Sequence, residues 1–312
     1  MMSVDIIVKF LFSVIRVSTP LIFGALAACI TKKAGLMNLA IESMMLASAL
    51  TGVLVSGATQ SLALGMLAGF AAAITITMIL SYAAFVLKCD LYLTSIAMNT
   101  ALVGGTVFVM FLATGQKANT SGDVASLAVP NFDIPILKDI PILGDILSGQ
   151  NILTYVAFLM IFAVWFFLYK TTIGLRIRSV GENPNAAESV GISPRKIYFL
   201  SFGLSGFIAA LGGMYMSMGY LTWFARDMMA GRGFISMSAM NIASGEPGTA
   251  ALAALMFGSA DALSNYMQMG KLPSELISMF PYVCTVVLLT VISLVRTVKE
   301  TAERNKARMN EV

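Results

Sequence analysis

The stretch KTTIGLRIRSVGENPNAAESVGISPRK, residues 170–196, is a long polar segment between two long apolar ones. Asn183 followed by Pro184 predicts a helix N-cap with proline at the first helical position, where its missing N–H costs nothing. Gly191 offers a left-handed stop. We therefore expect a short helix of about two turns, roughly 10 Å long, ahead of the apolar run that starts at Ile197.

The same stretch is rich in basic residues, which mark the cytoplasmic side of a membrane protein. They are Lys170, Arg176, Arg178, Arg195 and Lys196. We interpret residues 170–196 as a cytoplasmic loop. The alternative is an ordinary loop that happens to contain proline and glycine.

The composition predicts an all-α polytopic membrane protein. Of the 312 residues, 58% are hydrophobic and 12% are charged, whereas a soluble domain carries about 25% charged residues. Apolar stretches of membrane-spanning length recur along the chain. The net charge of +4 lies in loops and tail and indicates orientation rather than binding to nucleic acid. The N-terminus lacks the features of a removable leader, so we expect it to be retained.

Metal and histidine chemistry are not expected. The chain has no histidine, and its three cysteines lie far apart without metal-ligand spacing. No nucleophile–base set stands out either. We predict no catalytic residue, no metal site and no enzyme activity.

The apolar pattern predicts a single transmembrane domain, 1–312, with 8–10 spans, the N-terminus outside and the C-terminus inside. Residues 114–150, with the near-repeat IPILKD and IPILGD, form the predicted external loop, and 296–312 the cytoplasmic tail. The break GEPG at 245–248 predicts a half-helix or re-entrant segment near 233–248, buried in protein. The expected spans cover 3–31, 35–55, 62–87, 91–113, 151–169, 197–221, 249–267 and 274–294.

A weak internal echo predicts inverted-repeat halves. AGLMNLAIESMM (34–45) resembles AGRGFISMSAMN (230–241) in placement, and the predicted topology makes the two run in opposite directions. The alternative is that membrane helices rich in Gly, Ala and Met all look alike. The pairs Gly104-Gly105 and Gly212-Gly213 predict close approaches between helices.

Five polar residues in apolar spans are candidates for a substrate path. We expect Asn38 and Glu42 on one helical face, because they lie four residues apart. An unpaired carboxylate at mid-membrane costs about 2.5–3.5 kcal/mol. The alternative role is hydrogen bonding between helices, worth about 0.6 kcal/mol per contact. The candidates are Asn38, Glu42, Ser95, Asn99 and Asn241.

Several pieces of the chain resemble a known family. They are AGLMNLAIESMM, IPILGDIL, SVGENPNAAESVGIS, LSGFIAALGGMY, AGRGF with the P-G break, and ALMFGSADAL, in that order across about residues 20–297. The chain resembles permease subunits of bacterial ATP-driven importers of the ribose and branched-chain amino acid type. It is most similar to the nucleoside-uptake subgroup associated with basic-membrane-protein-type lipoproteins.

The resemblance implies a function and partners. It implies transport of a small polar solute, foremost a nucleoside, through a multi-pass permease in the bacterial cytoplasmic membrane. The implied partners are ATP-binding subunits, a second, related permease chain and an extracytoplasmic binding lipoprotein, besides the lipid bilayer. The segment GENPNAAESVGI corresponds to the coupling helix that docks on the ATPase, which implies coupling roles for Gly181, Glu182, Asn183, Pro184, Ala186, Ala187, Glu188 and Gly191.

The chain departs from the family pattern at two places. Family members commonly have N-x-G-x-E-G-M-M where this chain has Asn38 to Met45 with Ala40 and Ser43, and a Phe-Gly pair where it has Ile242-Ala243. These added side chains narrow the space near the expected solute path, and a sugar or a vitamin is the alternative to a nucleoside.

The residues themselves require a partner for ATP-driven transport. No GxxxxGK[ST] loop exists in the chain, so we expect no cofactor here and ATP on a partner subunit. An ion-coupled secondary transporter is the first alternative from another class, since one buried carboxylate can couple to a proton or sodium ion. An intramembrane enzyme and a structural scaffold are more distant alternatives.

Overall fold

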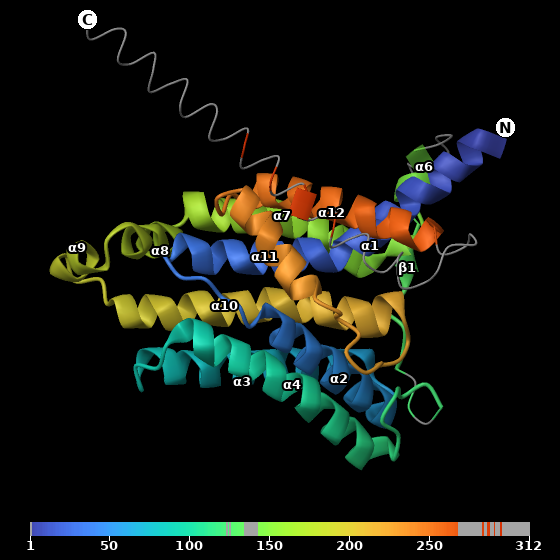
Figure 1. Ribbon diagram of the computed structural model, residues 1–312, viewed down its shortest axis with the longest axis horizontal. Helices are drawn as coiled ribbons and strands as arrows, with labels where there is room; N and C mark the ends of the chain where they lie inside the picture. Colours follow the sequence, from blue (N-terminus) through green and yellow to red (C-terminus); the bar gives the residue numbers. More distant parts are fainter. Residues whose placement is uncertain are drawn as a thin grey trace, which may run out of the picture.

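The computed structural model describes residues 2–122, 124, 126–133 and 143–267, with five single positions beyond 282. Long helices lie side by side in this part of the chain, and the only sheet assigned there is the pair of two-residue strands β1 and β2 (Figure 1). The elements in chain order are α1 (Met2–Lys33), α2 (Ile41–Thr59), α3 (Leu62–Phe85), α4 (Leu91–Thr114), β1 (Asn131–Phe132), α6 (Leu143–Leu147), β2 (Gln150–Asn151), α7 (Ile152–Lys170), α8 (Thr172–Glu182), α9 (Pro184–Ser189), α10 (Pro194–Met214), the π-helix η1 (Tyr215–Tyr220), α11 (Arg232–Ile242) and α12 (Pro247–Met267).

The prediction of an all-α polytopic membrane protein is confirmed. Six helices in the described part of the chain are long and apolar enough to cross a membrane: α1, α2, α3, α4, α7 and α10 with η1. The predicted break is also present, because α11 ends at Ile242 and α12 starts at Pro247 after a turn. The span predicted at 274–294 falls almost entirely outside the described residues.

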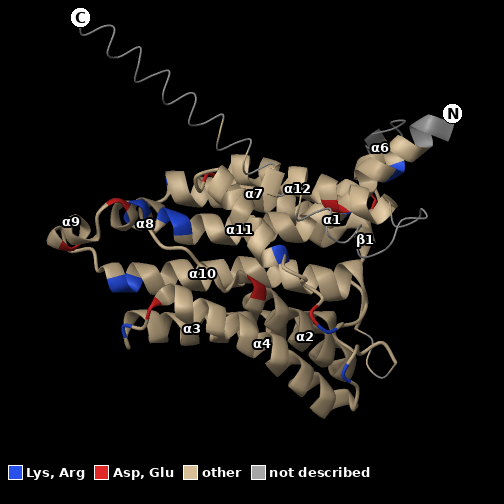
Figure 2. Ribbon diagram, viewed as in Figure 1, with Lys and Arg blue, Asp and Glu red and all other residues tan. Residues whose placement is uncertain are grey.

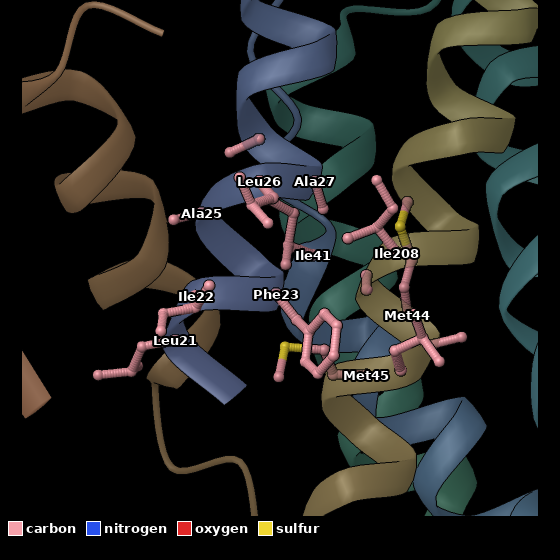
Figure 3. Packing of buried hydrophobic residues seen from close by; sticks show 14 of the residues in the cluster. Leu21, Ile22, Phe23, Ala25, Leu26, Ala27, Ile41, Met44, Met45 and Ile208 are labelled. Carbon is pink, nitrogen blue, oxygen red and sulfur yellow. The ribbon is translucent and has the colours of Figure 1, made fainter. Parts of the chain in front are cut away.

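Helix α1 occupies the centre of the bundle. It packs against α7, α10, α11 and α12, and its residues from Val17 to Ile30 are almost all buried. Pro20 lies inside it, so the first predicted segment is one continuous helix. Figure 3 shows Leu21 to Ala27 of α1 beside Met44 and Met45 of α2 and Ile208 of α10, which is where the apolar core lies.

Glycines set the distance between α10 and its neighbours. A Cβ at Gly213 would overlap the carbonyl oxygen of Met45, and one at Gly206 would overlap the Thr77 side chain. The close approach predicted for Gly212-Gly213 is confirmed. Gly104-Gly105 makes no such approach within the described chain, since a Cβ at either position meets no atom within 4 Å, and close packing there against a second chain stays a prediction.

The two ends of the bundle differ in charge. Helices α8 and α9 lie at one end of the bundle, where α1 ends and α10 begins (Figure 1). Figure 2 shows Lys and Arg gathered at this end. By the positive-inside rule this is the cytoplasmic end. The N-terminal end of α1 lies at the opposite end with α6 and β1 (Figure 1). The described parts of 114–150 lie there too, held to the 218–226 segment by backbone hydrogen bonds such as Val129 N–H to the Met218 carbonyl, 2.8 Å.

Candidate functional site

Helices α2 and α11 begin beside each other inside the bundle and run in opposite directions. Gly24 of α1 faces Ser236, and Lys32 faces Gly245, so α11 runs parallel to α1. Helix α10 runs against α1, because Tyr215 reaches back to the Arg16 carbonyl.

Helix α2 runs parallel to α10 and η1, because Gly213 lies against Met45 and, further along both segments, Met218 lies against Gly52. Since α10 is antiparallel to α1, α2 runs toward the external end and α11 toward the cytoplasmic end. The segments 34–45 and 230–241, which echo each other in sequence, therefore have the opposite orientations expected of inverted repeats.

Glu42 joins the two helix starts. Its Oε1 accepts a hydrogen bond from Gly231 N–H at 2.7 Å, and its Oε2 accepts one from Gly233 N–H at 2.9 Å. The approach is close enough that a Cβ on Gly233 would lie 2.7 Å from the Glu42 nitrogen. Glu42 is 5% exposed. Its carboxylate thus satisfies N–H groups that the first turn of α11 cannot satisfy itself.

Asn38 lies before α2 and not within it. The helix starts at Ile41, so the prediction that Asn38 and Glu42 share one helical face is wrong. The Asn38 side-chain oxygen accepts a hydrogen bond from Ala40 N–H at 3.0 Å, which is a local turn that competes with helix. Its amide donates to Ser205 Oγ on α10 at 3.1 Å.

Asn99 of α4 supports the start of α2. Its side-chain oxygen accepts from Ser43 N–H at 3.1 Å, and its amide donates to the Leu39 carbonyl at 2.8 Å. Ala40, at the N-cap position of α2, has no side chain that could do this. Ser95, one turn earlier on α4, is fully buried and donates to the Leu91 carbonyl.

An ion pair lies next to this junction. Arg232, the first residue of α11, approaches Asp261 of α12 with 3.3 Å between Nη2 and Oδ2. The Arg232 Nη1 also donates to the Met228 and Met229 carbonyls. The Arg232 side chain is only 21% exposed and forms part of the helix junction.

The structure brings together three of the five predicted path residues. Asn38, Glu42 and Asn99 meet around the start of α2, and their hydrogen-bonding groups are directed at backbone or at another helix. Asn241 is exposed near the other end of α11, about 13 Å along the helix from Arg232. The role in solute passage stays a prediction for all five, and the contacts of the three clustered residues favour the alternative of hydrogen bonding within the fold.

The predicted helix of the cytoplasmic loop is present as α9. The Asn183 side chain accepts hydrogen bonds from Asn185 N–H and Ala186 N–H, both at 3.1 Å. Pro184 occupies the first helical position, and Gly191 follows with φ of 84°. Both capping predictions are confirmed.

Helix α8, which precedes α9, was not predicted. Its buried side is formed by Gly174, Ile177 and Val180, at helical spacing, and Thr171 caps it by accepting from Gly174 N–H at 3.1 Å. Gly181 at its end lies so close to the end of α1 that a Cβ would overlap the Lys33 carbonyl. Helix α8, on which α9 packs, therefore ends directly against α1.

Not all residues with an implied coupling role are exposed on α9. Ala187 is 4% exposed and packed inside the chain, so it is not available for contact with a partner. Ala186, Glu182 and Glu188 are exposed as expected. Val190, which sequence reasoning passed over, is 74% exposed and offers the tip an apolar contact.

An ion pair ties the broken helix to the end of α1. The Lys33 Nζ lies 2.6 Å from Glu246 Oε1, and the Tyr169 hydroxyl donates to the same oxygen. Partial burial would raise the pKa of Glu246, but the hydrogen bonds from Lys33 and Tyr169 outweigh it and hold that pKa below its usual range. The turn between α11 and α12 is thus held in place by a charged glutamate.

Comparison with known proteins agrees with this architecture. The family model described as branched-chain amino acid transport system / permease component matches residues 10–291. The guanosine ABC transporter permease protein NupQ of Bacillus subtilis is 34% identical, and the alignment covers 88% of each chain. The nucleoside ABC transporter permease protein NupC of Lactococcus lactis is 29% identical over 87% of this chain and 88% of the relative.

A sugar permease is also similar. The putative glucose ABC transporter permease protein TsgC13 of Haloferax volcanii is 29% identical over 80% of this chain and 74% of its own. No solved structure matches the chain.

Proposed function

Because the chain belongs to the family of branched-chain amino acid transport system permease components, we propose that it is the permease subunit of an ATP-driven importer that moves a nucleoside across the bacterial cytoplasmic membrane. The observation that carries the choice of solute is the 34% identity to a guanosine permease over 88% of both chains. A sugar is the second candidate, supported by the similarity to a glucose permease. The permease component is not the subunit that hydrolyses ATP, and we assign ATP binding to a partner.

The ATP-binding subunit docks at the α9 tip in this proposal. Helix α9 protrudes at the cytoplasmic end (Figure 1), and both of its ends are fixed by caps. Its base is α8, whose Gly181 lies against the end of α1. A stiff mount of this kind transmits displacement to the membrane helices, whereas a flexible loop would absorb it.

The other two partners take separate surfaces. A second, related permease packs on the open face of α4, where Gly104 and Gly105 meet no atom of the described chain. The binding lipoprotein delivers solute to the external end, near the described parts of 114–150.

Uptake measurements test the transported solute. Co-expression with the ATP-binding subunit, second permease and lipoprotein should give ATP-dependent accumulation of labelled guanosine. Excess unlabelled nucleoside should reduce this accumulation, and excess glucose should not. Competition by glucose alone would select the sugar alternative. Concentrative uptake by this chain alone in liposomes, driven by an ion gradient, would refute the importer proposal.

The docking of the ATPase is tested at Val190. Val190→Asp places a charge on the exposed apolar tip and should lower both uptake and solute-stimulated ATPase activity, while membrane insertion is kept. Leu87→Asp is the matched control, since Leu87 is 60% exposed and follows α3, away from α9. Normal uptake and ATPase activity in Val190→Asp would exclude this tip as the docking surface.

A further inference from the structure

A cavity of about 530 Å³ opens at the cytoplasmic end of the bundle. It lies between the ends of α1 and α7, helix α8, and the turn that precedes α12. Its charged lining consists of Lys32, Lys33, Arg178, Glu182 and Glu246. Three cations face two carboxylates, so the cavity carries one net positive charge.

Two of the cations form no close ion pair with a carboxylate of the described residues, although Arg178 acts on Glu246 across the cavity. Lys33 pairs with Glu246, but no carboxylate of the described residues forms an ion pair with Lys32 or Arg178. The Arg178 guanidinium lies 4.8 Å from the centre of the Tyr169 ring. Its Nε donates to the Leu168 carbonyl at 3.0 Å, which holds the group at the cavity while its terminal nitrogens stay available.

An aromatic face of α7 leads away from the cavity along the membrane-spanning part of the helix. Phe158, Phe162, Trp165 and Phe166 are between 37% and 61% exposed, at helical spacing from Tyr169. The rings form a row, with Phe162 and Phe166 stacked at 6.3 Å and Trp165 6.3 Å from Tyr169. The buried residues of α7, such as Ala157, Val164 and Leu168, lie on its other side.

We propose that this cavity binds the headgroup of an anionic phospholipid from the cytoplasmic leaflet. Lys32 and Arg178 bind the phosphate, and the acyl chains lie along the aromatic face of α7. Basic pockets between membrane helices on the cytoplasmic side suit such headgroups. The adjoining apolar face favours a lipid over free phosphate, since a soluble anion gains nothing from it. The inference does not depend on which solute the protein transports.

Native mass spectrometry of the purified full chain tests the site. Delipidated protein is mixed with phosphatidylglycerol or, at equal concentration, phosphatidylcholine. We expect phosphatidylglycerol to bind preferentially, and Lys32→Gln and Arg178→Gln each to weaken it about fivefold. Lys196→Gln is the control, because Lys196 is an exposed cation at the same end that does not line the cavity. Melting temperatures check that each variant is folded. If Arg178→Gln misfolds, lipid binding by Lys32→Gln alone tests the site.

The source of the phosphate is tested separately. Glycerol 3-phosphate should compete poorly with the intact lipid, and Phe162→Ala should weaken lipid binding, whereas Phe108→Ala on α4 should not. Equal binding of the two lipids, equal loss in Lys196→Gln, or unchanged binding in folded Lys32→Gln would overturn the proposal. Competition by glycerol 3-phosphate as strong as that by lipid would make the cavity a soluble-phosphate site and refute the lipid assignment.

Discussion

Removing the Glu42 carboxylate separates a structural role from a role in the solute path. In Glu42→Ala, the N–H groups of Gly231 and Gly233 lose their partners inside the bundle. Each buried donor left unsatisfied costs about 1–3 kcal/mol, so the variant should lose about 2–6 kcal/mol of stability. At roughly 2–4 °C per kcal/mol, the melting temperature should fall by about 4–24 °C. Glu42→Gln keeps one acceptor oxygen and should lose about half as much.

The assay is thermal unfolding of the detergent-solubilised chain, in which size-exclusion chromatography measures the fraction that remains folded after heating. Uptake is measured in parallel in the assembled transporter. Glu188→Ala serves as the control, because Glu188 is an exposed carboxylate on α9. An unchanged melting temperature in Glu42→Ala together with lost uptake would refute the capping argument and return Glu42 to the solute path. A lowered melting temperature in the control would show that the assay does not report on this contact.

Two further predictions follow from the packing and from the ion pair. Gly213→Ala should destabilise the protein by about 1–3 kcal/mol or more and lower its melting temperature, because the new Cβ would overlap a carbonyl oxygen of α2. Gly104→Ala is the control and should leave the melting temperature unchanged, because its Cβ meets open space. Equal melting temperatures of the two variants would contradict the packing argument. Glu246→Gln should lower the melting temperature at neutral pH, because the hydrogen bonds from Lys33 and Tyr169 outweigh burial and keep the pKa of Glu246 low. Since a lowered pKa contributes stability above the usual glutamate pKa, the difference from wild type should persist from pH 8 to about 5 and vanish only below about pH 4; a difference that disappears at pH 6 would contradict this.

The elements that the sequence predicted well are those encoded by local chemistry. The Asn183-Pro184 start and the Gly191 stop of α9 depend on neighbouring residues alone, and both are present. The GEPG break is equally local. Helix α8 was missed because its apolar face is short and includes Gly174, so its residues read as a basic loop.

The errors arise where a side-chain or packing contact, and not residue spacing, decides the structure. Asn38 followed by Glu42 has helical spacing, but the Asn38 side chain bonds to Ala40 N–H and delays the helix to Ile41. The implied coupling role of Ala187 requires contact with a partner, but a small apolar residue also suits the interior of its own chain. Only the packing of α9 distinguishes the two, and it places Ala187 inside.

The polar residues at the helix junction follow from one requirement of the membrane interior. Two helices start there, and each helix N-terminus exposes N–H groups and carries about half a positive charge. Water is not available in the apolar core to satisfy them. Asn99 accepts from the α2 donor at Ser43, and the Glu42 carboxylate, itself in the first turn of α2, accepts from the two α11 donors at Gly231 and Gly233. A single negative charge thus offsets both helix starts, which explains why a glutamate is stable at a position where an unpaired one would be costly.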